Sequence, residues 1–477
     1  MFNLSKFINV IDDLYMNIRI QNLGAIKDAC IDLNKKLTVF CGPNNTGKTY
    51  VSYIIYALTS GETNMVDTLS DNQINSFINE KSLELNLNID EIYSFRLRQL
   101  LIIKDRLDSI FGISKDKAKS YFGDFNISYM TTKEEFQEKI ISENFVLKIS
   151  FYDFQIELSK ESNSNRITVK NISDKVTSND NTLSFARFML LSIVYHCLAF
   201  YPNTTATIFP VERNSIYTFN KELSIQRNTL VEQMQELSTN KKTNPLDLLL
   251  KRTTRYPKAI RDGLEIADDL VNIQNSKSLF YDFADELESE LLNGKVSVSK
   301  DGEVQFASDR AKMSKIPIHL SASIVKTLAS LTFYLRYLAK ENDLLIIDEP
   351  ELNLHPDSQI ILTRIFAQLL NRGFRLLIST HSDYIIRELN NLIMLSTATE
   401  AMKKKAKELR YKDDEHILST DVNVYLFNYR SRGKVSVKSI PVEDSGFEVE
   451  TIDMAINSLN KISEELFYTM KYGEDEK

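Results

Sequence analysis

The stretch best suited to chemistry is a loop at residues 42–49, GPNNTGKT, which follows the apolar run LTVF. It fits the pattern GxxxxGK[ST] with Gly42, Gly47, Lys48 and Thr49 at the defined positions. Glycine reaches backbone dihedrals that turn N–H groups inward around phosphate oxygens, and a helix beginning near Lys48 would point its positive end at the same anion. The loop therefore predicts a site for a nucleotide triphosphate. The other predicted contacts within it are Asn44, Asn45 and Thr46.

Two side chains at the end of this loop have distinct expected roles. Lys48 should reach the β- and γ-phosphates, and the Thr49 hydroxyl should occupy one position around Mg²⁺. The context supports this prediction, because LTVF has the composition of a strand and TYVSYIIYAL has helical apolar spacing. The alternative is a glycine turn between strand and helix that binds nothing. The predicted cofactors are ATP and Mg²⁺.

A second polar group follows the apolar run LLII, in the stretch DLLIIDEPELNLHPD at residues 343–357. Open parallel sheets place ligand-binding groups at the carboxyl ends of their strands. Asp348 lies at such an end and is predicted to hold Mg²⁺, whereas Glu349 is predicted to act as the base that polarises the attacking water. The alternative is a solvated acidic turn after the strand.

A third apolar run, RLLIST, ends at His381. A histidine at this strand end is suited to contact the γ-phosphate or to orient the water. The alternative is a histidine in an ordinary hydrogen-bonded turn. Strands that alternate with helices and end in polar groups predict an α/β fold of the P-loop NTPase class.

Composition limits the remaining possibilities. The 477 residues predict two or three compact units, and an apolar fraction of 43% is sufficient for buried cores. No stretch approaches the roughly 18 apolar residues of a membrane span, and no signal peptide is visible. The isolated cysteines argue against zinc and disulfides. We therefore expect a cytoplasmic protein without a membrane partner. A net charge of −7 restricts any nucleic-acid contact to local basic patches.

Changes in apolar pattern divide the chain into five segments. Residues 1–61 hold the phosphate loop, 62–121 form a helical insertion, 122–182 are rich in strands, 183–292 form a large inserted helical arm, and 293–477 complete the ATPase part. At the start of the last segment, GKVSVSKDGEVQF predicts a hairpin that turns at Asp301 and Gly302.

The order and spacing of these motifs resemble the ABC-type ATPase heads of the SMC, RecF and OLD class. The resemblance rests on GPNNTGKT, on IIDEPELNLHP with its Walker B acid and catalytic glutamate, and on STHSDYIIREL with its switch histidine. It is closest to prokaryotic AAA family ATPases of the kind found in anti-phage defence systems. It covers residues 16–61 and 290–395 well. It implies ATP-driven dimerisation of the head, or a higher homo-oligomer.

One motif departs from the family pattern. Such heads carry a signature near LSGG that binds the γ-phosphate held by the opposite subunit, and the matching stretch here is HLSASIVKTLASL. Ser321 and Ser323 are the predicted contacts to that phosphate. Ala322 replaces a glycine, which makes close backbone approach harder. The alternative is a helix simply capped by a serine.

Two basic clusters could contact a polyanion, although such clusters are more often solvated helix faces. One lies in the predicted arm and the other follows the third strand. Their members are Lys241, Lys242, Lys251, Arg252, Arg255, Lys258 and Arg261, and then Lys403, Lys404, Lys405, Lys407, Arg410 and Lys412. In IPVEDSG, Glu443 superficially resembles a TOPRIM nuclease glutamate, but no DxD follows, so a turn is predicted. FPVERNS, with Glu212 and Arg213, resembles a strand-end motif of the class.

The leading hypothesis is an ATPase that uses head dimerisation to control a separate effector protein, a nuclease or toxin, in anti-phage defence. This hypothesis follows from the resemblance. One alternative is a RecF-like DNA-repair ATPase that acts on DNA directly. Another is a scaffold in which bound ATP holds an interaction surface and turnover is negligible.

Overall fold

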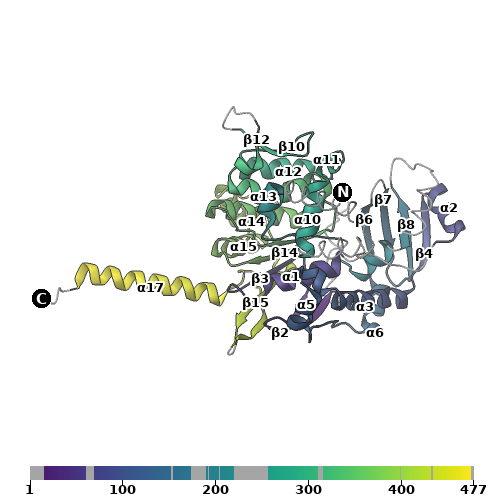
Figure 1. Cartoon of the computed structure of the whole chain (residues 1–477), viewed down its shortest axis with the longest axis horizontal. Coiled ribbons are helices and arrows are strands. Elements are labelled where there is room, and N and C mark those ends of the chain that lie inside the picture. Colours follow the sequence, from purple (N-terminus) through teal and green to yellow (C-terminus); the bar gives the residue numbers. More distant parts are fainter. Residues whose placement is uncertain are drawn as a thin grey trace, which may run out of the picture.

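A computed structural model describes the chain over residues 16–60, 69–151, 154–172, 190–191, 193–202, 205–219, 256–309, 315–397, 399–430 and 433–473. Its centre is a nine-stranded sheet in the order β5-β1-β2-β16-β15-β3-β14-β13-β9 (Figure 1). The strands, in that order, are Asn126–Tyr129, Asn17–Leu23, Ile26–Asp32, Val435–Ile440, Val422–Tyr429, Leu37–Cys41, Arg375–Thr380, Leu344–Asp348 and Ala206–Phe209. The predicted α/β class is confirmed.

The middle of this sheet is parallel. β3 pairs with β15 on one side and with β14 on the other, and β13 lies between β14 and β9, all in parallel. Every residue of β3 and β13 is buried, as their continuous apolar runs predict for strands covered on both faces. Because parallel strands share a direction, the loops that follow β3, β13 and β14 emerge at one edge of the sheet.

Two hydrophobic cores cover the two faces. Alternate residues of β13 point to opposite cores: Leu344 and Ile346 join the core that contains helix α1 (Lys48–Thr59), whereas Leu345 and Ile347 join the other. Three helices line that second core, α13 (Ser323–Phe333), α14 (Pro356–Asn371) and α15 (Asp383–Ser396). The sheet therefore lies between two layers of helices (Figure 1).

A separate four-stranded antiparallel sheet lies beside the α1 face, in the order β4-β8-β7-β6 (Figure 1). Its strands are Ser82–Asn86, Arg166–Asn171, Phe154–Lys160 and Phe145–Phe151, and nearby helices are α2 (Asp71–Asn79), α3 (Ile89–Asp105), α4 (Leu107–Phe111), α5 (Lys115–Phe122) and α6 (Lys133–Ser142). β4 lies inside the segment predicted to be wholly helical. Its alternating Leu83 and Leu85 are buried where β4 pairs with β8, so tertiary pairing determines its conformation.

The region predicted as a helical arm is divided. Residues 220–255, including Lys241, Lys242, Lys251, Arg252 and Arg255, lie outside the described residues. What the structure does describe belongs largely to the ATPase part: β9 is an edge strand of the main sheet, and α12 (Tyr281–Leu287) packs in the second core. The connecting helices are α10 (Lys258–Asp268), α11 (Leu270–Ile273) and the π-helix η2 (Glu288–Leu292).

The predicted hairpin is confirmed. β10 (Gly294–Val298) pairs antiparallel with β11 (Val304–Ser308), and Gly302 in the turn has a φ of 74°. The short strand β12 (Ile316–Pro317) completes this third sheet and leads through η3 (Ile318–Leu320) to α13. The π-helix η4 (Tyr334–Leu338) continues α13 toward β13.

The C-terminal part of the chain leaves the compact body. After α16 (Glu400–Glu408) and η5 (Ser419–Asp421), strands β15 and β16 return to the main sheet. The last helix, α17 (Glu450–Tyr472), then projects away from it, and none of its residues is buried (Figure 1). It is the last described element of the predicted segment 293–477. Across the described ranges, no helix is both long and apolar enough to cross a membrane.

Candidate active site

The loop between β3 and α1 has the backbone that its glycines predict. Gly42, Asn45 and Gly47 all have positive φ, at 129°, 61° and 91°. A Cβ atom at Gly42 would lie 2.0 Å from the carbonyl oxygen of Phe427, and one at Gly47 would lie 2.9 Å from Cδ1 of Ile26. The glycines are therefore required both by conformation and by the closeness of neighbouring strands.

Lys48 is folded over this loop. Its Nζ atom donates hydrogen bonds to the carbonyl oxygens of Gly42 at 2.8 Å and Pro43 at 2.9 Å. The side chain is only 6% exposed, and burial lowers the pKa of the ammonium group, while nearby Asp348 and Glu349 oppose that shift. α1 begins here after Gly47 with no side-chain cap, so its first amides can bind an anion.

Thr49 joins the phosphate loop to the acidic strand end. Its hydroxyl donates a hydrogen bond of 2.7 Å to Oδ2 of Asp348, although 299 residues separate the two in the chain. The other carboxylate oxygen, Oδ1, accepts a hydrogen bond from the Ser379 hydroxyl. Asp348 is 1% exposed, so these hydroxyl contacts compensate for its burial. A hydroxyl and a carboxylate side by side are oxygen ligands of the kind that Mg²⁺ prefers.

Glu349 is held in an uncommon backbone conformation. Its φ is 46°, in the left-handed region that side chains other than glycine rarely adopt. Its N–H donates to the carbonyl oxygen of Ser379 at 2.9 Å, which secures the turn. The side chain remains 29% exposed. Burial raises the pKa of this carboxyl group; nearby His381 lowers it, and Asp348 and Glu351 raise it further.

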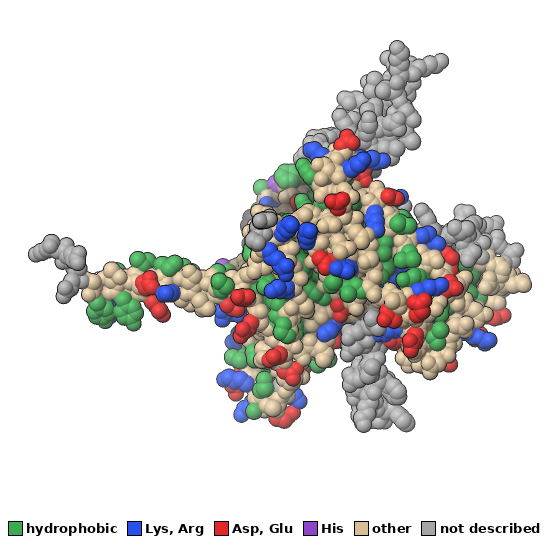
Figure 2. Space-filling view, turned by 90° about the horizontal axis from the view of Figure 1, so that it is seen from below, with side chains coloured by type: hydrophobic (Ala, Val, Ile, Leu, Met, Phe, Trp, Pro, Cys, Tyr) green, Lys and Arg blue, Asp and Glu red, His purple; other side chains and the backbone are tan. Residues whose placement is uncertain are grey.

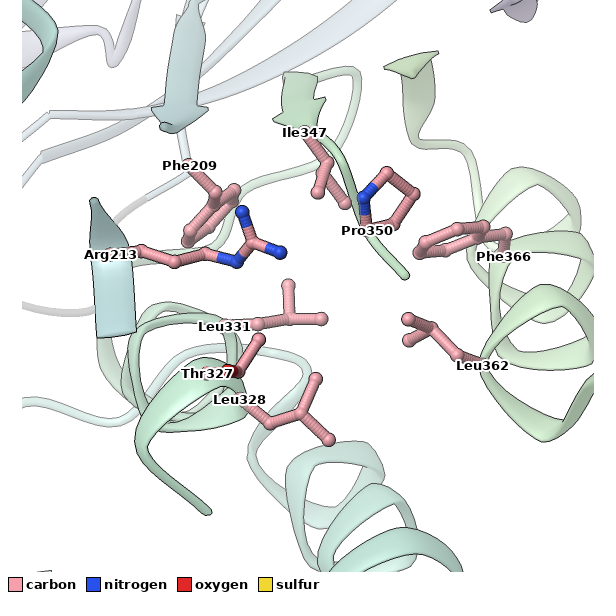
Figure 3. A pocket seen from close by; sticks show the side chains of 9 residues that line it. All are labelled: Phe209, Arg213, Thr327, Leu328, Leu331, Ile347, Pro350, Leu362 and Phe366. Carbon is pink, nitrogen blue, oxygen red and sulfur yellow. The ribbon is translucent and has the colours of Figure 1, made fainter. Parts of the chain in front are cut away.

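Arg213 secures the same turn from the opposite side. Its guanidinium group donates to the carbonyl oxygens of Asp348 at 2.6 Å, Glu349 at 2.7 Å and Pro210 at 3.0 Å. It reaches them past apolar side chains, including Phe209 and others that line a small pocket (Figure 3). Arg213 is 3% exposed, and this burial lowers its pKa to about 10. Two of these charge-assisted bonds therefore fix the end of β13, and the third holds Arg213 to the residue that follows β9.

Glu351 connects the turn to His381. Its Oε1 atom accepts hydrogen bonds from the Thr380 hydroxyl at 2.9 Å and from the His381 N–H at 2.8 Å. The His381 ring atom Nδ1 lies 3.4 Å from that oxygen and 3.9 Å from Oε1 of Glu349. Within the described parts of the chain, the buried Oε2 atom of Glu351 has no hydrogen-bond partner. The histidine side chain, which is 44% exposed, is thus placed near two carboxylates.

The signature-like segment lies on a separate element. Ser321 donates to the carbonyl oxygen of Ile318 at 2.6 Å, and α13 begins at Ser323 after Ala322, which makes no side-chain cap. The alternative interpretation, a serine capping this helix, is therefore wrong. The amides at the start of α13 remain available to an anion. α13 also contacts the turn after β13, where Asn353 Nδ2 lies 3.5 Å from the Thr327 hydroxyl.

The remaining predicted contacts are scattered. The second basic cluster begins on the exposed helix α16, where Lys403 pairs with Glu400 and Lys405 with Glu408; beyond α16, Lys412 pairs with Glu290 of η2. From the first cluster, Lys258 pairs with Asp262, and Arg261 bonds to Ser109. Glu443 forms the predicted turn, exchanging backbone hydrogen bonds of 2.9 Å with Gly446.

Three functional contacts were not predicted from the sequence. Ser379 binds Asp348, Glu351 binds His381, and Arg213 binds the backbone after β13. Two of these had a local signal, because Ser379 lies two residues before His381 and Glu351 lies two after Glu349. Arg213 lay in a recognised motif, but no local pattern could identify carbonyl groups 135 residues away as its partners.

Comparison with solved structures finds many similar chains, among them three SMC head domains with low TM-scores. An SMC head bound to the C-winged helix domain of ScpA is 11% identical, with 91% of this chain and 99% of that one covered and a TM-score of 0.34. The head from Pyrococcus furiosus, with an extended coiled coil and bound to the C-terminal domain of ScpA, is 12% identical (94% and 98% covered, TM-score 0.31). The head from Thermotoga maritima is 9% identical (90% and 100% covered, TM-score 0.29).

A search of curated proteins finds no match. The sequence itself matches a protein family over residues 16–386, a range that contains the phosphate loop, the acidic turn after β13 and His381. That range covers most of the chain and all the contacts described around Asp348. The chain therefore belongs to the AAA ATPase domain family.

Proposed function

We propose that this chain binds ATP with Mg²⁺ and hydrolyses it. The observation that carries the proposal is the 2.7 Å hydrogen bond between the Thr49 hydroxyl and the Asp348 carboxylate. It joins the loop suited to phosphates with the strand end suited to a cation, beside the Lys48 ammonium group. Neither group alone would distinguish a nucleotide site from a buried polar contact.

Each predicted site residue then has a role. Backbone amides of the loop and the Lys48 ammonium group bind the phosphates; the loop residues are Gly42, Asn44, Asn45, Thr46 and Gly47. Thr49 and Asp348 hold Mg²⁺, and when bound this ion neutralises charge on the phosphates. Ser379 and the close packing around Asp348 keep its carboxylate oriented.

Glu349 accepts a proton from the attacking water. Its raised pKa makes it a stronger base than an exposed glutamate. Its backbone is fixed because its carbonyl oxygen accepts a hydrogen bond from Arg213 and its N–H donates one to the Ser379 carbonyl oxygen. His381, near both Glu349 and Glu351, senses the γ-phosphate. Ser321 and Ser323 contact the nucleotide of a second subunit, for which the uncapped amides of α13 are suited.

The biological role that we propose is control of a separate effector protein, a nuclease or toxin, through ATP-driven closure of two heads. Its setting in anti-phage defence rests on the resemblance in motif order and spacing. The ion pairs within the exposed basic helix α16 favour this role over direct DNA binding, because acids beside the lysines weaken attraction to phosphate.

Substitution of Glu349 tests the catalytic proposal. Glu349→Gln should retain ATP binding and lower turnover by about 100- to 10,000-fold, since it removes the base and little volume. Lys48→Ala should lose binding itself. Both are measured as nucleotide affinity and as phosphate release. The matched control is Glu443→Gln, which changes an exposed glutamate in the turn after β16. Undiminished turnover by Glu349→Gln would contradict the assignment.

A further inference from the structure

The projecting helix α17 carries an apolar face that the rest of the chain does not cover. No residue of the helix is buried, and from Asn457 onward every residue of it is exposed. Leu459 is 64% exposed, Leu466 is 67% exposed and Met470 is 78% exposed. Figure 2 shows hydrophobic side chains along this helix, away from the body. A helix of this length gains most of its stability by burying such a face.

The spacing of the apolar residues indicates what covers them. Beyond Ile452, which packs against the head, the apolar residues on this face are separated by four, three and four positions; they are Ala455, Leu459, Ile462 and Leu466, and the polar Thr469 follows three positions later. This is the 3.5-residue repeat of a helix that pairs with another helix in a left-handed coiled coil. A surface helix that does not pair with another helix does not require this 3.5-residue repeat.

The charges on α17 argue against a lipid or nucleic-acid partner. The helix carries four acidic side chains and only two lysines, Lys461 and Lys471. Helices that lie on anionic membranes are rich in Lys and Arg on their polar face, and phosphate contacts need the same charges. The apolar face therefore suits another protein helix.

We propose that this partner is the α17 of a second copy of the chain, paired in parallel. In such a pair the apolar residues of the two helices meet along a seam, and the residues that flank this seam do not place like charges opposite each other. Ser458 would face Ser463, and Glu465 would face Met470. Parallel pairing also places both heads at the same end, since α17 leaves each head at its first residue (Figure 1). The pairing needs no nucleotide.

The test is the mass of the full-length, nucleotide-free protein in EDTA, measured by light scattering over a dilution series. The wild type should have twice the 54.9 kDa chain mass, and Leu459→Asp/Leu466→Asp should have one chain mass. Asn457→Asp/Asn460→Asp adds the same charges outside the apolar seam and should remain a dimer. A monomeric wild type, a dimer that survives the leucine substitutions, or a mass that is no multiple of the chain would overturn the proposal.

Cross-linking tests the orientation. In a chain with the exposed Cys30 replaced by serine, Ile462→Cys should form a disulfide with its own counterpart under mild oxidation, because position 462 lies on the seam. Asn457→Cys, outside the seam, should not. Absence of the 462–462 cross-link, or equal cross-linking at 457, would exclude a parallel pair. Neither variant should unfold, because both residues lie on exposed turns of α17.

A further variant separates this pairing from the proposed ATP-driven closure. In the Leu459→Asp/Leu466→Asp background, Glu349→Gln should be monomeric without nucleotide and dimeric with ATP and Mg²⁺. If the Glu349→Gln variant dimerises with ATP but the wild type is monomeric without nucleotide, only the proposed α17 pair is overturned. A chain that pairs without nucleotide but never binds ATP would overturn only the proposed ATPase function.

Discussion

Charged side chains are usually exposed and apolar side chains are usually buried. The edge of the main sheet where β13 and β14 end departs from the first tendency, and the C-terminal helix α17 departs from the second. At the sheet edge, Asp348 is 1% exposed and Arg213 is 3% exposed, although both are charged. On α17, Leu466 is 67% exposed although it is apolar. Burial of charge and exposure of apolar surface both cost free energy unless a partner compensates.

The two regions differ in where that partner comes from. Around Asp348 much of the compensation is internal, because hydroxyl groups of Thr49 and Ser379 bind the carboxylate. α17 has no such internal compensation among the described residues, since nothing packs over its outer turns. The sheet edge is thus prepared before any ligand arrives, whereas α17 is completed only by another molecule. This contrast predicts that substitutions at the edge affect the fold strongly and substitutions on α17 do not.

The largest expected effect is that of Gly42→Ala. The new Cβ atom would lie 2.0 Å from the carbonyl oxygen of Phe427, in a backbone with a φ of 129°. Because that oxygen belongs to a central strand and cannot move aside cheaply, the free energy of unfolding should fall by about 4 kcal/mol or more. Urea denaturation measures it.

Gly433→Ala is the matched control for this substitution. Gly433 also has a positive φ, 71°, but a Cβ atom there would meet nothing within 4 Å. Only the backbone cost of about 1–2 kcal/mol should remain. Equal losses at both glycines would mean that the close approach to Phe427 is unimportant.

Arg213→Met should have the next largest effect. The substitution keeps most of the apolar stem and removes three hydrogen bonds to buried carbonyl oxygens, so about 2–4 kcal/mol of stability should be lost. Turnover should fall about tenfold with little change in ATP affinity, because the turn that carries Glu349 loses its anchor. Steady-state kinetics and denaturation measure the two effects.

Arg387→Met provides the comparison at an exposed site. Arg387 is 62% exposed and pairs with Asp383 one helical turn away, and such pairs contribute below about 0.5 kcal/mol. If Arg213→Met proved as mild as Arg387→Met, the buried guanidinium group would not be what fixes the end of β13.

The pH dependence of hydrolysis should follow Glu349. Burial raises its pKa, so the carboxyl group becomes protonated at a higher pH than an exposed glutamate, whose pKa is about 4.3. A protonated carboxyl cannot accept the proton from water, and activity should therefore fall as the pH drops through this raised value. The rate of phosphate release, measured from neutral to acidic pH on protein shown to remain folded, gives the midpoint. A midpoint at or below the value for an exposed glutamate would contradict the role of burial.

Much of the active site could be predicted from the sequence because its signals are local. A glycine pattern after one apolar run, two acids after a second and a histidine after a third imply strand ends, and parallel strands bring their ends together. The positions of Lys48, Thr49 and Asp348 follow from that reasoning. The spacing of apolar residues likewise predicted a strand-rich segment at residues 122–182, where β5 to β8 lie, and the hairpin at Gly302.

The contacts that were missed depend on tertiary packing. Arg213 acts on carbonyl groups, which every residue carries, so no side-chain pattern identifies its partners. β4 forms because it pairs with β8, although helices flank it in the chain. The sequence of α17 indicates an amphipathic helix, but an amphipathic pattern does not reveal whether its apolar face covers the same chain.

The smallest expected effect distinguishes α17 from the core most directly. Leu389 and Leu466 both lie on helices, but Leu389 is fully buried in the second core and Leu466 is 67% exposed. Leu389→Ala should cost about 2–5 kcal/mol because it leaves a cavity in packed surroundings. Leu466→Ala should change the unfolding free energy of the head by less than about 0.5 kcal/mol, since no part of the head packs against it. Denaturation followed by a signal from the head compares the two, and a large loss at Leu466 would mean that α17 folds back on the body and that its apolar face is not free for a second chain.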